Sequence, residues 1–200
     1  MKVRYIFLGV GVILGVLLAL TGWQLLRSPY QYQGSFIDPP VQAPDFQLTS
    51  SNGGLFRLSE QRGKTVLLFF GYTHCPDVCP VTLAVYGQIR EKLGGLADQV
   101  EFAFITVDPE RDTPEKIAAH LQNFDPSIIG LSGDQSALEK AWKDYGVLVE
   151  KQIGSADEYL IDHTARIYVV DAQGNLRLTY TFGTQADVIV EDLLHLIKDI

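Results

Sequence analysis

The segment Thr65–Pro80, TVLLFFGYTHCPDVCP, decides how the rest of the chain is interpreted. Its first part, Thr65–Phe70, is a short apolar run, which is typical of a central strand buried on both faces. Pro80 is a favourable residue for the first turn of a helix. Cys75 and Cys79 therefore lie in the turn from a buried strand into a helix. Open α/β sheets place their ligand sites at this end of their strands.

Strands and helices alternate on both sides of this segment. Before it, Phe46–Leu48 and Leu55–Leu58 flank Asn52-Gly53-Gly54, which predicts a hairpin. After it, apolar periodicity predicts helices beginning near residues 80 and 114, a third helix around 138–145 and a last one around 189–197. The further strands are expected at 100–107, 128–131, 166–170 and 176–182, the last two forming a closing hairpin around Gln173-Gly174-Asn175.

This order predicts an α/β fold with a largely parallel central sheet, to which the closing hairpin adds an antiparallel edge. We therefore expect a thioredoxin-like fold with an added N-terminal β-hairpin. An irregular insertion, residues 149–162, precedes the closing hairpin.

The N-terminus predicts one transmembrane helix. Ile6–Leu26 contains 21 residues without a charge, and a helix of that length rises about 31 Å, enough to cross a bilayer. Lys2 and Arg4 precede it, which places the N-terminus in the cytoplasm and the rest of the chain outside, as expected at a bacterial inner membrane with the soluble domain in the periplasm. A cleaved signal peptide is the alternative, and it also exports the domain.

Three segments follow from this interpretation: a membrane anchor at 1–27, an extended proline-containing linker at 28–42 and the thioredoxin-like domain at 43–200. Three of the 16 basic residues lie in the anchor, which leaves 13 basic against 24 acidic residues in the rest of the chain. This acidic balance disfavours nucleic acid as a partner.

The two cysteines are too few for a disulfide scaffold, and their position indicates chemistry. A helix N-terminus favours the thiolate, which is both the nucleophile and the metal ligand. Three residues separate Cys75 from Cys79, whereas thioredoxin-type redox sites have two. A neutral imidazole would complete a trigonal site suited to Cu(I). Zinc with an open fourth position, and two inert buried cysteines, are the alternatives.

Four histidines could supply that imidazole. His74 adjoins Cys75 and is expected to tune local charge, because adjacent residues seldom turn to the same ion. His120 is expected to be solvated on its helix. His195 is expected on the polar face of the last helix, between two acidic residues. His163 ends the insertion and directly precedes a strand, so in a thioredoxin-like fold it would face the cysteine turn.

Three segments resemble the Sco/SenC family: CPDVCP at 75–80, VDPERDTPE at 107–115 and YLIDHT at 159–164. The similarity covers about residues 43–199 and the N-terminal anchor. Members are copper-binding factors in the assembly of cytochrome c oxidase. By this resemblance Cys75 and Cys79 would be thiolate ligands and His163 the third ligand of one copper ion per chain, and residues 149–162 would form a mobile flap.

The resemblance also implies partners: subunit II of cytochrome c oxidase or a similar cuproprotein, a copper donor, a thiol reductant and, through the N-terminal helix, the membrane. Two roles follow from it, copper delivery to the CuA site and reduction of the CuA cysteines. A peroxide-reducing enzyme fits the paired cysteines poorly, and a copper or redox sensor would need a signalling partner.

Overall fold

The computed structural model describes residues 14–16, 18, 30–152 and 159–198. The predicted membrane anchor, residues 1–27, lies almost wholly outside this range. Within the described residues, no helix is both long and apolar enough to cross a bilayer. Residues 32–200 form one compact unit.

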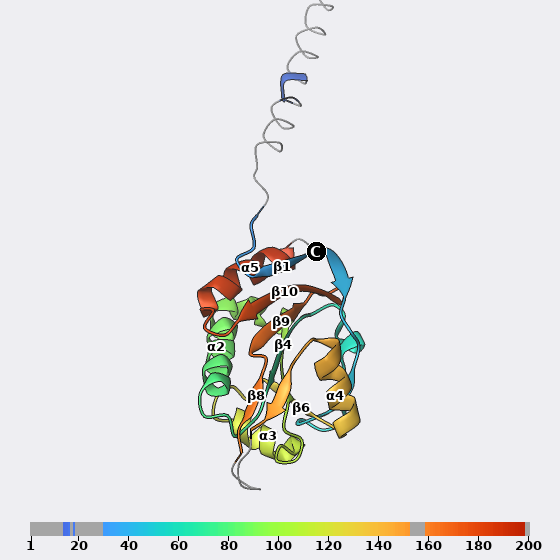
Figure 1. Cartoon of the computed structure of the whole chain (residues 1–200). Helices are drawn as coiled ribbons and strands as arrows, with labels where there is room; N and C mark the ends of the chain where they lie inside the picture. The colour runs from blue at the N-terminus through green and yellow to red at the C-terminus, as the bar shows by residue number, and fades with distance from the viewer. Residues whose placement is uncertain (1–13, 17, 19–29, 153–158, 199–200) are drawn as a thin grey trace, which may run out of the picture. The chain divides into compact units, whose positions relative to one another are not determined.

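An eight-stranded sheet runs through this unit in the order β1-β10-β9-β4-β5-β6-β2-β3 (Figure 1). Strands β4, β5 and β6 are parallel to one another, and β9 is antiparallel to β4. The strands are β1 (Ser35–Gln42), β2 (Gln47–Ser50), β3 (Leu55–Arg57), β4 (Thr65–Gly71), β5 (Val100–Thr106), β6 (Ile129–Ser132), β9 (Arg166–Val170) and β10 (Asn175–Thr181). This arrangement confirms the predicted thioredoxin-like core and the N-terminal hairpin β2–β3.

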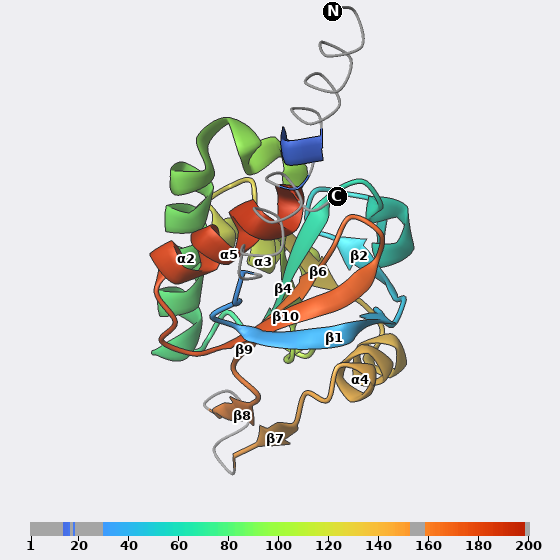
Figure 2. The ribbon, with the colours of Figure 1, turned by 90° about the horizontal axis from the view of Figure 1, so that it is seen from above.

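Helices cover both faces of the sheet. Helices α2, α3 and α5 lie on one face, and α4 lies on the other (Figures 1 and 2). Right-handed crossovers from β4 to β5 and from β5 to β6 put α2 and α3 on the same side. The helices are α2 (Val78–Leu93), α3 (Pro114–Leu121), α4 (Gln135–Asp144) and α5 (Ala186–Lys198), with short 3-10 helices at Leu58–Gln61 and Gly94–Gln99.

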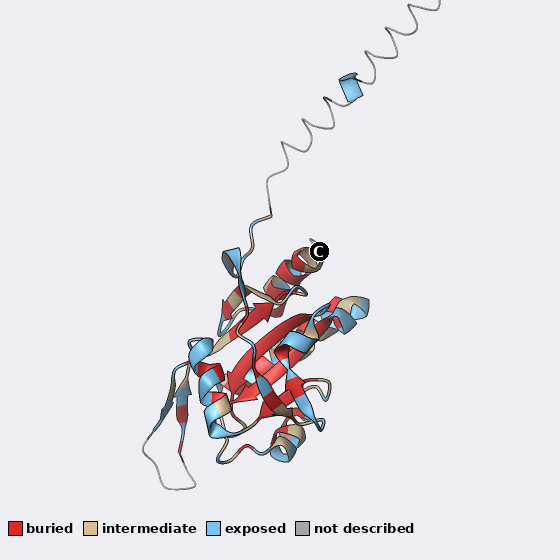
Figure 3. Ribbon diagram, turned by 90° about the vertical axis from the view of Figure 1, so that its right-hand side faces the viewer, coloured by how far each residue is buried: buried red, intermediate tan, exposed pale blue. Residues whose placement is uncertain are grey.

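Strand β4 is the centre of the core, and every one of its residues is buried. Figure 3 shows the sheet as the most buried layer of the unit. On the α2 side, the ring of Phe69 packs against Phe104. On the other side, Phe70 packs against Tyr145 and Tyr168. Burying each such side chain stabilises the fold by about 1.5–3 kcal/mol, so the strand that leads into the cysteines is firmly held.

The segment expected to be an extended linker differs from that expectation, because residues 35–42 form strand β1 at the edge of the sheet. Strand β1 pairs antiparallel with β10, and its register shifts between Phe36 and Val41. Pro39 and Pro40 lie within this interruption. Proline donates no hydrogen bond, so edge strands and bulges are the places in a sheet that accept it. The proline pair therefore marks an irregular edge strand instead of a spacer.

Asp192 fixes the start of this edge strand. Its carboxylate accepts hydrogen bonds from the backbone N–H groups of Gln33 and Gly34, at 3.1 and 2.9 Å, and from the hydroxyl of Tyr180 at 2.9 Å. Asp192 is one of the two acidic residues expected with His195 on the polar face of the last helix. That expectation is wrong for Asp192, because its side chain is fully buried.

The described ends of the insertion are more regular than expected. Strands β7 (Val149–Lys151) and β8 (Ile161–His163) form a two-stranded antiparallel sheet, in which Val149 pairs with His163. This pair, the β7–β8 hairpin, projects from the main sheet (Figure 2). Residues 153–158, in the middle of the predicted flap, lie outside the described residues. His163 is thus carried by a hydrogen-bonded strand.

Candidate metal centre

Cys75, Cys79 and His163 come together at the end of β4. Their potential ligand atoms all lie within 4.8 Å of one another. The Sγ atom of Cys79 and Nε2 of His163 are 3.7 Å apart. Neither cysteine forms a disulfide. Two sulfurs and one imidazole nitrogen at this spacing could close around a metal ion in a three-coordinate site.

The turn from β4 into α2 places the cysteines differently. The helix begins at Val78, two residues before the expected Pro80, so Cys79 lies in its first turn and is fully buried. Cys75 precedes the helix, is partly exposed, and its sulfur accepts a hydrogen bond from the backbone N–H of Cys79 at 3.4 Å. An N-terminal helix N–H has no partner within the helix, so it is free to stabilise the Cys75 thiolate.

The absence of a side chain at Gly71 leaves space for the sulfur of Cys79. A Cβ atom at this position would lie 2.9 Å from Sγ of Cys79 and 2.8 Å from the ring of Phe104. Both distances are shorter than van der Waals contact. The glycine at the end of β4 is therefore required by the close approach of the first turn of α2.

His163 presents one ring nitrogen to the cysteines. Its ring packs edge-on against those of Tyr72 and Phe69, with centroids 5.9 and 6.3 Å away. Nδ1 lies 3.3 Å from the carbonyl oxygen of Thr164. A carbonyl can only accept, so in the neutral ring this contact puts the proton on Nδ1. It leaves the lone pair of Nε2 directed at Cys79, which is the form that binds a metal.

The two thiols have opposite acidities. A hydrogen bond from the Cys79 thiol, opposed by partial burial, lowers the pKa of Cys75 to about 3. The same hydrogen bond and burial raise the pKa of Cys79 far above its usual value. At neutral pH the metal-free pair is therefore one thiolate and one thiol. A metal that binds both sulfurs must displace the proton of Cys79.

The other histidines do not join this group. His74 is exposed, and its Nδ1 lies 3.0 Å from the hydroxyl of Thr73. The expectation that His120 is solvated is wrong, because its ring packs against Phe104 and Phe124 and burial lowers its pKa. Its Nε2 is buried and has no hydrogen-bond partner in the described part of the chain.

A second group of possible ligands was not predicted from the sequence. Atoms of His74, Asp108 and Asp112 also lie within 4.8 Å of one another. Both carboxylates are buried and accept hydrogen bonds from protein donors, Asp108 from Arg111 and Asp112 from Thr73. Protein donors thus already occupy oxygen atoms of both carboxylates.

A cavity of about 250 Å³ lies between α2, the end of β10 and the start of α5, and Cys75, Cys79 and His163 are not among its lining residues. Phe69, which contacts His163, and Thr82, one turn after Cys79, are among its lining residues. On its outer side lie Val81 and Phe182, each 45% exposed. The cavity and the three-residue group are thus linked through Phe69.

Comparison with known proteins identifies the family. The SCO1/SenC family model matches residues 37–198. The SCO2-like protein of Rickettsia typhi is 30% identical over 185 residues, 91% of each chain. Copper-bound ScoI of Bradyrhizobium japonicum is 38% identical over 78% of this chain and 99% of its own, with a TM-score of 0.72. Apo Sco1 of Thermus thermophilus is 40% identical over 85% of this chain and 99% of its own, with a TM-score of 0.76. The chain belongs to the SCO1/SenC family.

Proposed function

We propose that this protein binds one copper ion through Cys75, Cys79 and His163 and delivers it to the CuA site of cytochrome c oxidase subunit II or of a similar cuproprotein. The observation that carries the proposal is the convergence of the three ligand atoms within 4.8 Å. Two thiolates and an imidazole are soft enough for Cu(I). A relative solved with copper bound supports the choice of metal.

The arrangement of the ligands suits transfer. Cys79 is fully buried, whereas Cys75 and His163 are partly exposed. A three-coordinate ion has an open position for an incoming thiolate, and exchange can begin at the exposed side. The partly apolar cavity lined by Phe69, which also contacts His163, offers a partner a surface near the site. Copper can then leave in steps, without the protein unfolding.

The proposal includes a place in the cell. The uncharged segment 6–26, preceded by Lys2 and Arg4, supports a single-pass anchor in a bacterial inner membrane, with the domain on the periplasmic side. In that oxidising compartment the metal-free cysteines can form a disulfide. A thiol reductant must then restore them before a copper donor can load the site.

A transfer experiment tests the proposed delivery. The full-length protein is loaded with Cu(I) and mixed with the reduced, metal-free soluble domain of a CuA-containing subunit, and copper in each partner is measured after separation. We expect copper to move to the acceptor faster than it does from a Cu(I)-chelator complex of equal affinity. Equal rates would overturn delivery while leaving copper binding intact.

A second role, as a thiol–disulfide reductase, is favoured by the low pKa of Cys75. The Cys75 thiolate would attack one sulfur of a target disulfide and release the other as a thiolate. Cys79, on losing its proton, would then displace the second target sulfur. The target gains two electrons as two thiols, and the pair is left as a disulfide. The external reductant regenerates it.

The two roles separate at His163. His163→Ala removes a copper ligand but neither sulfur. If delivery is the main role, oxidase assembly fails in this variant even when reductant is added. If reduction is the main role, the variant supports assembly and still reduces a model disulfide.

A further inference from the structure

The turn Val107–Pro114, VDPERDTP, joins β5 to α3 and takes no part in the proposed copper binding. It is unusual because Asp108 and Asp112 are 2% and 0% exposed. Burying a carboxylate is costly unless it is well hydrogen-bonded. The donors that meet this need include Thr73, which precedes the cysteines, and Tyr159, which precedes His163.

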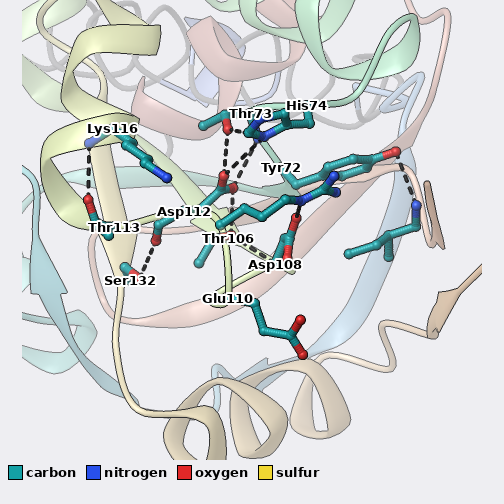
Figure 4. Close-up of polar contacts among 12 residues, drawn as sticks. Tyr72, Thr73, His74, Thr106, Asp108, Glu110, Asp112, Thr113, Lys116 and Ser132 are labelled. Carbon is teal, nitrogen blue, oxygen red and sulfur yellow. Dashed lines mark hydrogen bonds and ion pairs between the residues drawn. The ribbon is translucent and has the colours of Figure 1, made fainter. Parts of the chain in front are cut away.

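Asp112 holds the cysteine side. It accepts hydrogen bonds from the backbone N–H of Thr73 at 3.0 Å, from the Thr73 hydroxyl at 2.5 Å and from the hydroxyl of Thr106 at 2.8 Å. Figure 4 shows these donors converging on Asp112. Thr73 precedes Cys75 by two residues. The turn therefore fixes the backbone that leads into the first thiolate.

Asp108 holds the histidine side. Its Oδ1 accepts a hydrogen bond from the hydroxyl of Tyr159 at 2.7 Å. Its Oδ2 accepts one from Nε of Arg111 at 2.5 Å. The guanidinium of Arg111 also lies over the ring of Tyr159, 3.6 Å from its centroid. Tyr159 is buried and precedes His163 by four residues, so this contact ties the chain entering β8 to the turn.

Two further residues, Tyr72 and Lys151, tie the β7–β8 hairpin to the cysteine segment and to the 107–114 turn respectively. The hydroxyl of Tyr72 accepts a hydrogen bond from the backbone N–H of Ile161 at 3.2 Å. Lys151 forms an exposed ion pair with Glu110 at 2.7 Å, and its ammonium also lies 3.7 Å from the centroid of the Tyr159 ring. Exposed ion pairs contribute little. The hydrogen bond between Tyr159 and Asp108 is buried, so it should contribute more than this ion pair does.

We infer that the Asp108–Arg111–Tyr159 cluster is a latch that positions His163 against the two cysteines. The members of this cluster are positioning residues, because none of them supplies a ligand atom to the group of Cys75, Cys79 and His163. The inference rests on the proposed copper site and adds what holds its third ligand in place. Groups that orient metal ligands typically change metal affinity 10- to 100-fold when removed.

Tyr159→Phe tests the latch, since it removes only the hydroxyl. Tyr145→Phe is the matched control, because Tyr145 also donates one hydrogen bond, to the carbonyl of Pro44. Full-length proteins are compared by Cu(I) competition with a chelator and, after loading with Cu(II), by the nitrogen splitting that a bound imidazole gives in the EPR spectrum. We expect Tyr159→Phe to weaken Cu(I) binding about tenfold or more and to diminish the nitrogen splitting. The control should match the parent.

A double-mutant cycle shows whether the effect passes through His163. In the His163→Ala background, Tyr159→Phe should change copper affinity less than about twofold, because there is no ligand left to position. Arg111→Lys keeps the charge but loses the planar stack. Arg111→Lys should therefore also weaken copper binding, and only in the background that retains His163.

The outcomes are distinct. If Tyr159→Phe and Arg111→Lys leave affinity and nitrogen splitting unchanged while His163→Ala weakens binding, the latch is wrong and the copper site stands. The latch is also wrong if Tyr159→Phe weakens binding equally in both backgrounds. If His163→Ala itself has no effect, the proposed ligand set fails, and the latch fails with it.

Discussion

Nε2 of His163 lies 3.7 Å from Sγ of Cys79, although 84 residues separate them in the sequence. The contact joins the first turn of α2 to the end of β8. Both are held by the buried strand β4, which leads into the cysteine turn and packs Phe69 against the imidazole ring. A histidine this close to a free thiol and a thiolate is poised for a metal ion.

The unequal acidity of the cysteines predicts unequal labelling. In the reduced, metal-free protein at pH 5, iodoacetamide should modify Cys75 and leave Cys79 unmodified, because the pKa of Cys75 is about 3 and that of Cys79 is strongly raised. Mass spectrometry of the digested protein measures both sites.

Cys79→Ala is the control, since the hydrogen bond from Cys79 is the main cause of the low pKa of Cys75. In this variant, labelling of Cys75 at pH 5 should slow about tenfold or more. The reason is that the thiolate fraction falls tenfold for each pH unit by which the pKa exceeds the pH. Equal labelling of both cysteines in the parent would refute this assignment of charge.

Copper binding should release about one proton from the two cysteines at pH 8. Cys75 is ionised beforehand, so only Cys79 has a proton to lose. The raised pKa of Cys79 means that affinity rises with pH, about tenfold per pH unit. Calorimetry in buffers of different ionisation enthalpy measures the proton count. A release of two protons would show that both cysteines start as thiols.

Gly71→Ala should displace the sulfur of Cys79, because the new Cβ would lie 2.9 Å from it. Overpacking of this kind costs about 1–3 kcal/mol of stability, and we expect copper affinity to fall as well. Chemical denaturation and chelator competition measure the two effects.

Gly87→Ala is the matched change in helix α2, where a Cβ would meet no atom within 4 Å. It should stabilise the protein by about 0.5–1 kcal/mol, because alanine favours the helix more than glycine does. If both variants bound copper like the parent, the close packing at Gly71 would be unimportant for the site.

Asp192→Ala should destabilise the domain by about 3 kcal/mol, since it leaves the backbone N–H groups of Gln33 and Gly34 and the buried hydroxyl of Tyr180 without this acceptor. Proteolysis should then cut near strand β1 more readily. Asp187→Ala is the control on the same helix, because its ion pair with Lys92 is largely exposed and its loss should change stability little. An equal loss of stability in the two variants would show that the buried hydrogen bonds of Asp192 are unimportant for the domain.

The sequence predicted those parts of the site that depend on local pattern. The apolar run of β4 and the prolines of the cysteine segment indicated a strand leading into a helix, and the position of His163 before a strand indicated that it faces this turn. Strand β1 was missed because Pro39 and Pro40 are equally typical of a linker, and only pairing with β10 makes them part of an edge.

The buried carboxylates were missed for a different reason. Asp108, Asp112 and Asp192 look like surface residues in a sequence, because each has at least one donor far away along the chain. Asp108 meets Tyr159 51 residues later, and Asp192 meets Gln33 159 residues earlier. The environment of His120 was misjudged similarly, since its contact with Phe104 depends on how α3 packs on β5.

The most direct test of the central claim is copper analysis of the full-length protein and of three single variants, Cys75→Ala, Cys79→Ala and His163→Ala. Each is reduced, exposed to Cu(I) buffered by a chelator, and freed of excess metal. We predict one copper ion per chain in the parent and less than half of that in every variant at the same free Cu(I). Full copper in any one of the three variants, His163→Ala above all, would contradict the account.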